Sequence, residues 1–236
     1  MKLVGERRAL SAIIFAFYFL IFLLVGLNPE LPPGFDKAFF GLASVYGLAF
    51  FSLVAGYFWA RWYSVGLGLF GLILAAVGTW QAGEVVFQFA FLGLTHLAAI
   101  AMLWGQTMSE TYDGQTAWRE KLHMDENAVQ RLGRSVIRAG VSLPFVLLYA
   151  LVPRANTTHF IFSIGALVMA TLGMRALVRL KTWGVLAMGV AGAMMLVMAG
   201  SDIVTHHHAL GPALGGSLLI FAAVPWLRPA AAYLRV

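Results

Sequence analysis

The chain has 236 residues, of which 61% are hydrophobic and only 11% are charged. Ordinary soluble proteins carry about 25% charged residues, so this composition excludes a soluble globular domain. Cysteine is absent, which excludes disulfides, thiolate metal sites, iron–sulfur clusters and cysteine nucleophiles. The formal net charge is +6, but the basic residues are distributed as in a membrane protein, and we expect no nucleic-acid partner.

Apolar runs punctuated by short polar turns dominate the sequence, and a bilayer is crossed by about 20 apolar residues. We therefore predict an all-α, polytopic membrane helix bundle of eight transmembrane helices, forming a single integral membrane domain over residues 1–236. The eighth run is the shortest, and it starts within a glycine-rich stretch. The predicted spans are residues 9–27, 38–60, 63–80, 85–104, 135–152, 160–180, 183–204 and 214–227.

Residues 105–134 form the long polar segment of the chain, which we expect to be cytoplasmic. From Ala128 onward, apolar residues recur at helical spacing, which predicts an amphipathic helix running into the fifth span. Arg131, Arg134 and Arg138 share another face of this helix. We expect the helix to lie along the inner leaflet, with these arginines binding lipid phosphates; the alternative is a simply solvated face.

The sixteen basic residues test the eight-span topology. Lys37 and Arg154 fall on one side of the membrane, and the other fourteen fall on the opposite side. Cytoplasmic loops are enriched in Lys and Arg, so this split predicts a multi-pass cell-membrane (inner-membrane) protein with both termini cytoplasmic. The fourteen are Lys2, Arg7, Arg8, Arg61, Arg119, Lys121, Arg131, Arg134, Arg138, Arg175, Arg179, Lys181, Arg228 and Arg235.

An internal duplication is a further hypothesis. Shifting the chain by half its length, 236/2 = 118 residues, lays spans one to four over spans five to eight. Under this shift Glu84 aligns with Asp202, and Arg61 aligns with Arg179. Four spans per unit would give two parallel four-helix repeats, residues 1–118 and 119–236, related by an axis along the membrane normal. The alternative is that four-span units with short turns generally look alike.

Polar residues gather at the ends of spans on the predicted outer face. Asp202 and His206 are four residues apart and would share a helical face, a plausible pair of ligands for a divalent metal. Glu84 and Gln88 repeat the spacing at the equivalent place in the other half. Consecutive histidines point about 100° apart on a helix, so the triplet from His206 onward cannot chelate as a set. The competing interpretation is that these residues mark the ends of spans.

His96 is predicted near the centre of the fourth span, where an ionisable residue usually faces the protein interior or a water-filled path. Glu84, Gln88, Leu92 and His96 are spaced by fours, and such a stripe would line an entry route. Equally, His96 would be a neutral histidine bonded to a neighbouring span. Bis-histidine haem requires a second histidine at the same depth, and the sequence offers none.

These patterns favour movement of a small solute or cation through a polar site that opens outward. Its pathway would use Glu84, Gln88, His96 and Asp202, and any cofactor would be a divalent metal held by Asp202 and His206. Two alternatives stay open: a non-catalytic membrane anchor or assembly subunit of a larger, redox-type complex, and a membrane-embedded metalloenzyme. The expected partners are the lipid bilayer and either other membrane subunits or further copies of the chain.

Overall fold

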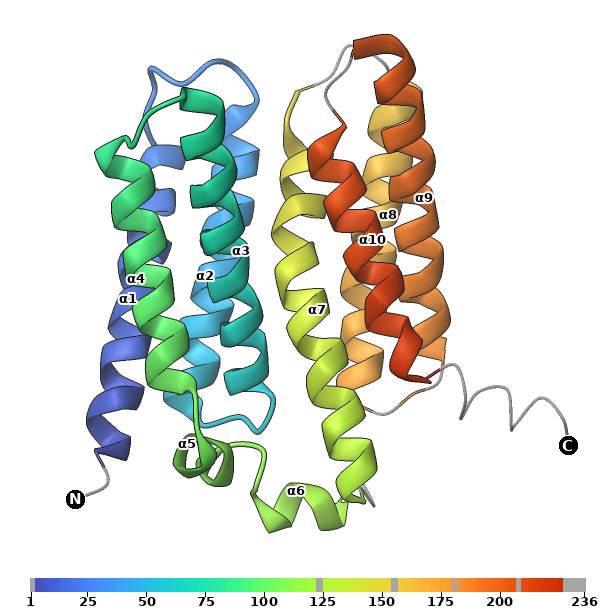
Figure 1. Ribbon diagram of the computed structural model, residues 1–236. Coiled ribbons are helices and arrows are strands. Elements are labelled where there is room, and N and C mark those ends of the chain that lie inside the picture. Colours follow the sequence, from blue (N-terminus) through green and yellow to red (C-terminus); the bar gives the residue numbers. More distant parts are fainter. Residues whose placement is uncertain are drawn as a thin grey trace, which may run out of the picture.

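The computed structural model describes residues 3–121, 125–153, 157–179, 181, 183–206 and 209–226, and this part of the chain is helical without a strand (Figure 1). The chain ends and Arg154 lie outside the described residues. The helices are α1 (Val4–Gly26), α2 (Phe35–Ala55), α3 (Ala60–Ala82), α4 (Phe87–Leu103), α5 (Gln106–Thr111), α6 (Thr116–Lys121), α7 (Glu126–Leu151), α8 (Thr157–Val178), α9 (Trp183–His206) and α10 (Leu210–Ala223), followed by the 3₁₀ turn Val224–Trp226.

Six of the described helices, α1, α2, α3, α7, α8 and α9, are long and apolar enough to cross a membrane. The prediction of an all-α membrane helix bundle is therefore confirmed. The fourth and eighth predicted spans correspond to α4 and α10, which have 17 and 14 residues. Both are shorter than the other apolar helices, so the predicted total of eight spans depends on whether these two helices cross the membrane.

The apolar helices form two groups of four, which we call the first half (α1–α4) and the second half (α7–α10) (Figure 1). The halves meet mainly where α3 packs against α7, and α2 also contacts α7. In the predicted repeat, a two-fold axis would map α3 onto α9 and α7 onto α1. Because α3 packs against α7, the same axis would require α9 to pack against α1. Instead, α1 and α9 lie on opposite outer sides of the molecule, so the packing does not support the predicted axis between repeats.

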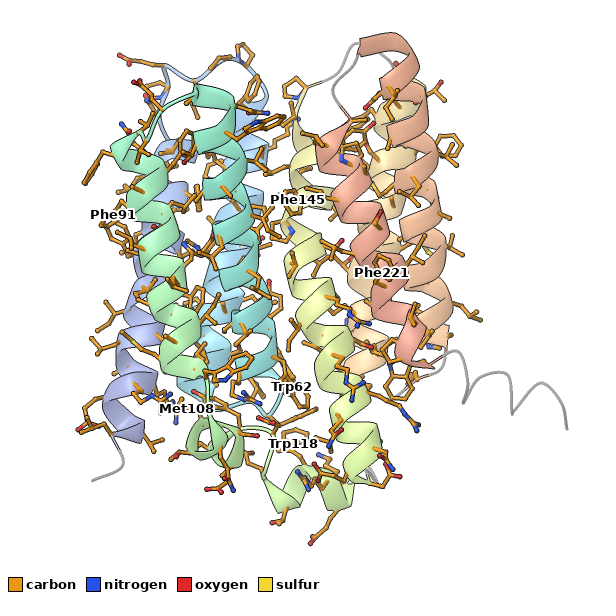
Figure 2. All side chains as sticks on the ribbon, in the orientation of Figure 1. Trp62, Phe91, Met108, Trp118, Phe145 and Phe221 are labelled. Atoms are coloured by element: carbon orange, nitrogen blue, oxygen red, sulfur yellow. The ribbon has the colours of Figure 1, made fainter. Side chains whose placement is uncertain are left out.

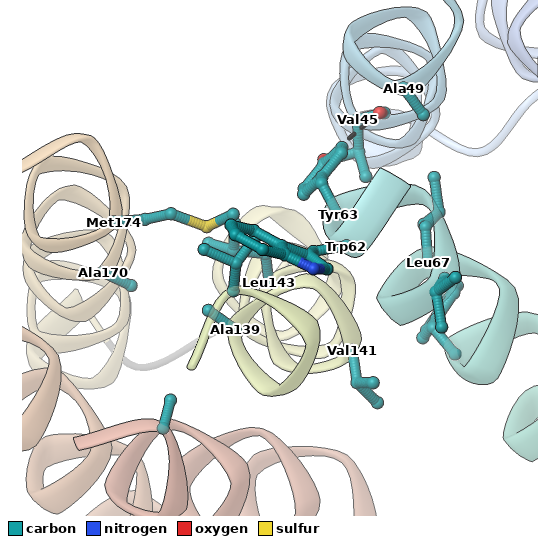
Figure 3. Packing of buried hydrophobic residues seen from close by; sticks show 14 of the residues in the cluster. Val45, Ala49, Trp62, Tyr63, Leu67, Ala139, Val141, Leu143, Ala170 and Met174 are labelled. Carbon is teal, nitrogen blue, oxygen red and sulfur yellow. Dashed lines mark hydrogen bonds between the residues drawn. The ribbon is translucent and has the colours of Figure 1, made fainter. Parts of the chain in front are cut away.

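Glycine allows the two halves to approach backbone to backbone. A Cβ atom added to Gly66 of α3 would lie 2.3 Å from the carbonyl oxygen of Ile137 on α7. Small residues at helix crossings permit such close contact in membranes. Farther along the same interface, the rings of Phe70 and Phe145 meet edge to face, with centroids 4.8 Å apart. Figure 3 shows the buried side chains around this interface, including Tyr63 on α3 and Leu143 on α7.

The bundle has a basic end, which we define as the end that carries α5, α6 and the start of α1 (Figure 1). The helices α2, α4, α8 and α10 end there (Figure 1), and the last four carbonyls of a helix lack intrahelical partners. Arg8 donates to Leu53 O of α2 at 2.9 Å, and Arg7 donates to Met102 O of α4 at 2.9 Å. These cations also lie at the negative ends of the helix dipoles, which stabilises both helix ends.

The end of α10 is completed in the same way. Pro225 has no N–H group, so it cannot bond to the carbonyl oxygen of Phe221 one turn earlier. Arg138 of α7 donates to that oxygen instead, at 2.6 Å. Ser135, also on α7, donates to the neighbouring carbonyl of Ala222 at 2.6 Å. Polar side chains of α7 therefore hold the end of α10 in place.

Candidate functional site

A buried carboxylate lies near the opposite end of the second half. Asp202 belongs to the last turns of α9, and only 6% of the residue is exposed. Its Oδ2 accepts a hydrogen bond of 2.7 Å from the hydroxyl of Tyr149 on α7. Its Oδ1 lies 3.6 Å from Nδ1 of His159 on α8. We call these three residues the Asp202 cluster; each comes from a different helix.

Within the Asp202 cluster, His159 is more exposed than Asp202: its side chain is 24% exposed, against 9% for the side chain of Asp202. A carboxylate oxygen accepts more than one hydrogen bond. Carboxylate and imidazole groups are also ligands for cations. The cluster has the chemistry of a small cation-binding or donor-binding site.

The predicted metal pair shares only Asp202 with this cluster. The side chain of His206 falls outside the described positions, as do His207 and His208. Among the residues that the structure describes, no three His, Asp or Glu side chains gather closely enough to hold a metal ion. Metal binding by Asp202 and His206 therefore stays a prediction.

The first half contains a second polar cluster, centred on His96, which is fully buried on α4. Its Nδ1 lies 2.8 Å from Leu92 O, and because a carbonyl only accepts, this nitrogen carries the proton. Nε2 then accepts from the hydroxyl of Tyr46 on α2, also at 2.8 Å. Both ring nitrogens of the neutral histidine are thus used, which is the arrangement of a histidine bonded to a neighbouring span.

Aromatic and small residues close the space around His96. The ring of Tyr18 on α1 lies 4.6 Å from the His96 ring, centroid to centroid, and its hydroxyl is 2.6 Å from Thr95 Oγ1. A Cβ atom added to Gly71 of α3 would lie 2.1 Å from Cδ2 of His96. The histidine therefore occupies a space that glycine leaves open. We call Tyr18, Tyr46, Thr95 and His96 the His96 cluster.

Glu84 and Gln88 do not join either cluster. Glu84 is exposed in the turn between α3 and α4, because α4 begins only at Phe87. The expected helical stripe from Glu84 to His96 thus lacks its first member. Gln88 is exposed in the first turn of α4. Both residues belong to the first half, whereas Asp202 belongs to the second.

A charged cavity of about 530 Å³ lies at the basic end, between α3, α5 and α7. Arg61 of α3 donates from two nitrogens to the two carboxylate oxygens of Asp113, at 2.7 and 2.8 Å. Arg119 pairs with Glu126 at 2.8 Å on another side of the cavity. Trp62, labelled in Figure 2, contributes to the wall. The sequence analysis missed this cavity, since each of its ion pairs joins residues on different elements.

The three arginines predicted to bind lipid headgroups have separate surroundings. Arg138 binds the end of α10, as described above. Arg134 lines the charged cavity and donates to Gln130 Oε1 at 3.4 Å. Arg131 is half-buried. The amphipathic segment does run into the fifth span, but it continues α7 as one helix of 26 residues, standing with the bundle rather than lying along a membrane surface (Figure 1).

Comparison of the chain with models of known protein families, with curated proteins and with solved structures found no match.

Proposed function

We propose that α4 and α10 also cross the membrane, which gives eight spans, and that the basic end faces the cytoplasm together with both termini. A helix of 17 residues is about 26 Å long, slightly less than the hydrocarbon thickness of about 30 Å. The 3₁₀ turn that follows α10 extends it by three residues. Cytoplasmic orientation of the basic end follows from its Lys and Arg content.

We propose that the protein moves a small polar solute or a cation across the membrane, with the Asp202 cluster as its outer site. The observation that carries this proposal is the carboxylate of Asp202, which is buried between three apolar helices beside the partly exposed His159. Ionisable groups inside membrane bundles are energetically expensive, and they commonly mark substrate or ion pathways.

Helix α7 links the outer site to the charged cavity. Tyr149 belongs to the Asp202 cluster, and Ile137 of the same helix lines the cavity. Ile137 and Tyr149 are twelve positions apart, about 18 Å along the helix, and the close contact at Gly66 lies beside this stretch. In the proposed cycle the halves move against each other at this contact, so that the solute reaches the cavity from the outer site.

The test is flux into proteoliposomes that contain the purified protein and dyes for H⁺, Na⁺, Mn²⁺ and Zn²⁺. We expect flux of at least one of these ions above that of empty liposomes, and its loss in Asp202→Asn. Glu84→Gln is the matched control, since it removes an exposed carboxylate from the first half and should leave flux unchanged. Absence of flux in the wild type, or equal flux in Asp202→Asn, would refute the proposal.

A second candidate is a non-catalytic subunit that anchors or assembles a larger complex. The His96 cluster favours it, because a core whose polar groups satisfy one another suits a rigid scaffold. Mild-detergent purification from native membranes separates the candidates. Stoichiometric partner subunits together with inactive proteoliposomes would support anchoring, whereas flux from the purified chain alone would support transport.

A further inference from the structure

A second cavity, of about 390 Å³, lies between α2, α7 and α8, on the side of the α3–α7 contact where α2 packs. We call it the lipid-facing groove. Its walls are mostly apolar, with Leu48 from α2, Leu143 from α7, and Met174 and Val178 from α8. Figure 3 shows Met174 reaching from α8 toward Leu143. Arg175 and Arg179 line the same groove.

Arg175 and Arg179 differ from the arginines that bind carbonyl groups of neighbouring helices. Arg7, Arg8 and Arg138 donate to backbone carbonyls of neighbouring helices. No hydrogen bond or ion pair joins the exposed guanidinium of Arg175 or Arg179 to any residue that the structure describes. Arg175 lies in the last turn of α8, Arg179 directly follows the end of this helix, and both line the groove. Two neighbouring cations without a partner among the described residues present a site for an anion.

The position of the groove along the bundle matches one leaflet of a bilayer. α8 ends at the basic end, so Arg175 and Arg179 lie near the membrane surface there. From Arg179 back to Thr171, the groove follows eight residues of α8, about 12 Å, close to half of the hydrocarbon thickness of about 30 Å. Trp59, also in the groove, stacks on Tyr57 with centroids 5.7 Å apart. Such aromatic pairs are typical of the membrane–water interface.

We infer that the lipid-facing groove binds one anionic phospholipid from the leaflet at the basic end. The phosphate lies between Arg175 and Arg179, and one acyl chain runs along Leu48, Leu143 and Met174. Basic pockets between membrane helices bind anionic headgroups in this manner. The bound lipid fills the space between α2 and α8 and thereby connects the two halves beside the α3–α7 contact.

The headgroup is tested by native mass spectrometry of the purified chain titrated with phosphatidylglycerol or phosphatidylcholine. We expect one tightly bound phosphatidylglycerol per chain and a clearly weaker phosphatidylcholine. Arg175→Gln with Arg179→Gln should weaken phosphatidylglycerol binding about 30-fold. Lys37→Gln with Lys121→Gln removes the same charge from two exposed lysines elsewhere in the chain and should leave the affinity unchanged. Equal weakening in both double variants would overturn the inference.

The acyl chain is tested by filling the groove while both arginines remain. Thr171 is exposed, and its hydroxyl bonds only to carbonyls of its own helix, so Thr171→Phe leaves no buried polar group unsatisfied. We expect it to weaken phosphatidylglycerol binding by a factor of ten or more, and we expect excess inorganic phosphate not to compete. Unchanged binding in Thr171→Phe, or displacement by inorganic phosphate, would contradict a lipid in this groove.

Discussion

The His96 cluster and the Asp202 cluster are both buried polar groups built around a tyrosine hydroxyl, yet they differ in what they leave available. His96 is fully buried and uses both ring nitrogens inside the first half. Asp202 is buried as well, but its neighbour His159 is partly exposed. One cluster is closed to solvent, and the other includes a solvent-exposed side chain at the end of the bundle opposite the basic end.

The chemistry of the two side chains explains the difference. A neutral imidazole has one donor and one acceptor, so two hydrogen bonds complete it. A carboxylate has about four acceptor positions, so Asp202 can engage several partners at once, and the bond from Tyr149 fills one of these positions. Burial depth alone therefore does not identify a functional ionisable residue. The number of hydrogen-bonding positions that its neighbours can fill is the better guide.

The largest loss of stability is expected at Gly71, where the His96 cluster leaves no space for a Cβ atom. Gly71→Ala would put a methyl group within 2.1 Å of the His96 ring, which forces the ring or the helices apart. We expect the free energy of unfolding to fall by about 3 kcal/mol, the upper range for overpacking. Reversible unfolding in mixed detergent measures it. Gly189→Ala, where nothing lies within 4 Å of the added atom, is the matched control, and equal losses would contradict this account.

The second-largest loss of stability is expected when the hydrogen bond between Tyr46 and His96 is removed. Tyr46→Phe leaves Nε2 of His96 buried without a donor, and His96→Leu leaves the Tyr46 hydroxyl without its acceptor. Each should reduce the free energy of unfolding by about 1 to 3 kcal/mol. The double variant should lose less than the sum of the two, because no orphaned partner remains. Simple additivity would show that the pair is not coupled.

In the Asp202 cluster, by contrast, we expect a substitution to reduce ion flux and to change stability little. An asparagine at position 202 can still accept from Tyr149, so Asp202→Asn should change the free energy of unfolding by less than about 1 kcal/mol. The same variant should lose ion flux. A loss of stability as large as that of His96→Leu would make both clusters structural, and the contrast between them would disappear.

A hydrogen bond between two helices, outside both clusters, gives a reference value for these changes in the free energy of unfolding. Ser142 of α7 donates to Gly215 O of α10 at 2.6 Å, in a buried position. Ser142→Ala should cost about 0.6 kcal/mol, the average for such bonds inside membranes. The same unfolding assay measures it, and ion flux should be unaffected. A loss above about 2 kcal/mol would mean that this bond, too, belongs to a coupled network.

Hydropathy predicted which segments are helices, and the predicted spans overlap the observed helices throughout. The amphipathic pattern after Ala128 is also confirmed, since Val129, Leu132 and Val136 are buried. The helical pattern in the sequence begins at Ala128, two residues after the observed start of α7 at Glu126. Asp125 caps this helix by accepting a hydrogen bond from Ala128 N at 2.6 Å. Local chemistry of this kind is readable from the sequence, because the interacting residues are neighbours in the chain.

The contacts between helices could not be predicted in this way. Hydropathy gives the depth of a residue, but packing decides its rotation about the helix axis. His96 and Tyr46 are fifty residues apart, and no spacing rule connects them. The spacing of four residues predicts that Glu84 continues the helical stripe of Gln88 and His96, but Val86 is extended and α4 starts after it. His159 directly precedes the sixth predicted span and Asp202 lies near the end of the seventh, so hydropathy predicts their shared depth but not their contact.

Arg7 and Arg8 have a consequence for how the chain is assembled during synthesis. They lie in the first turns of α1, ahead of its longest apolar stretch, so in the proposed topology their charge orients that helix before later segments have left the ribosome. Their final acceptors are made afterwards: Leu53 lies 45 positions beyond Arg8, and Met102 lies 95 positions beyond Arg7. In that topology the two side chains act twice, first as topology signals and later as hydrogen-bond donors that hold α2 and α4 against α1. Nascent chains that end before Met102 keep the signal but lack the second of these hydrogen bonds.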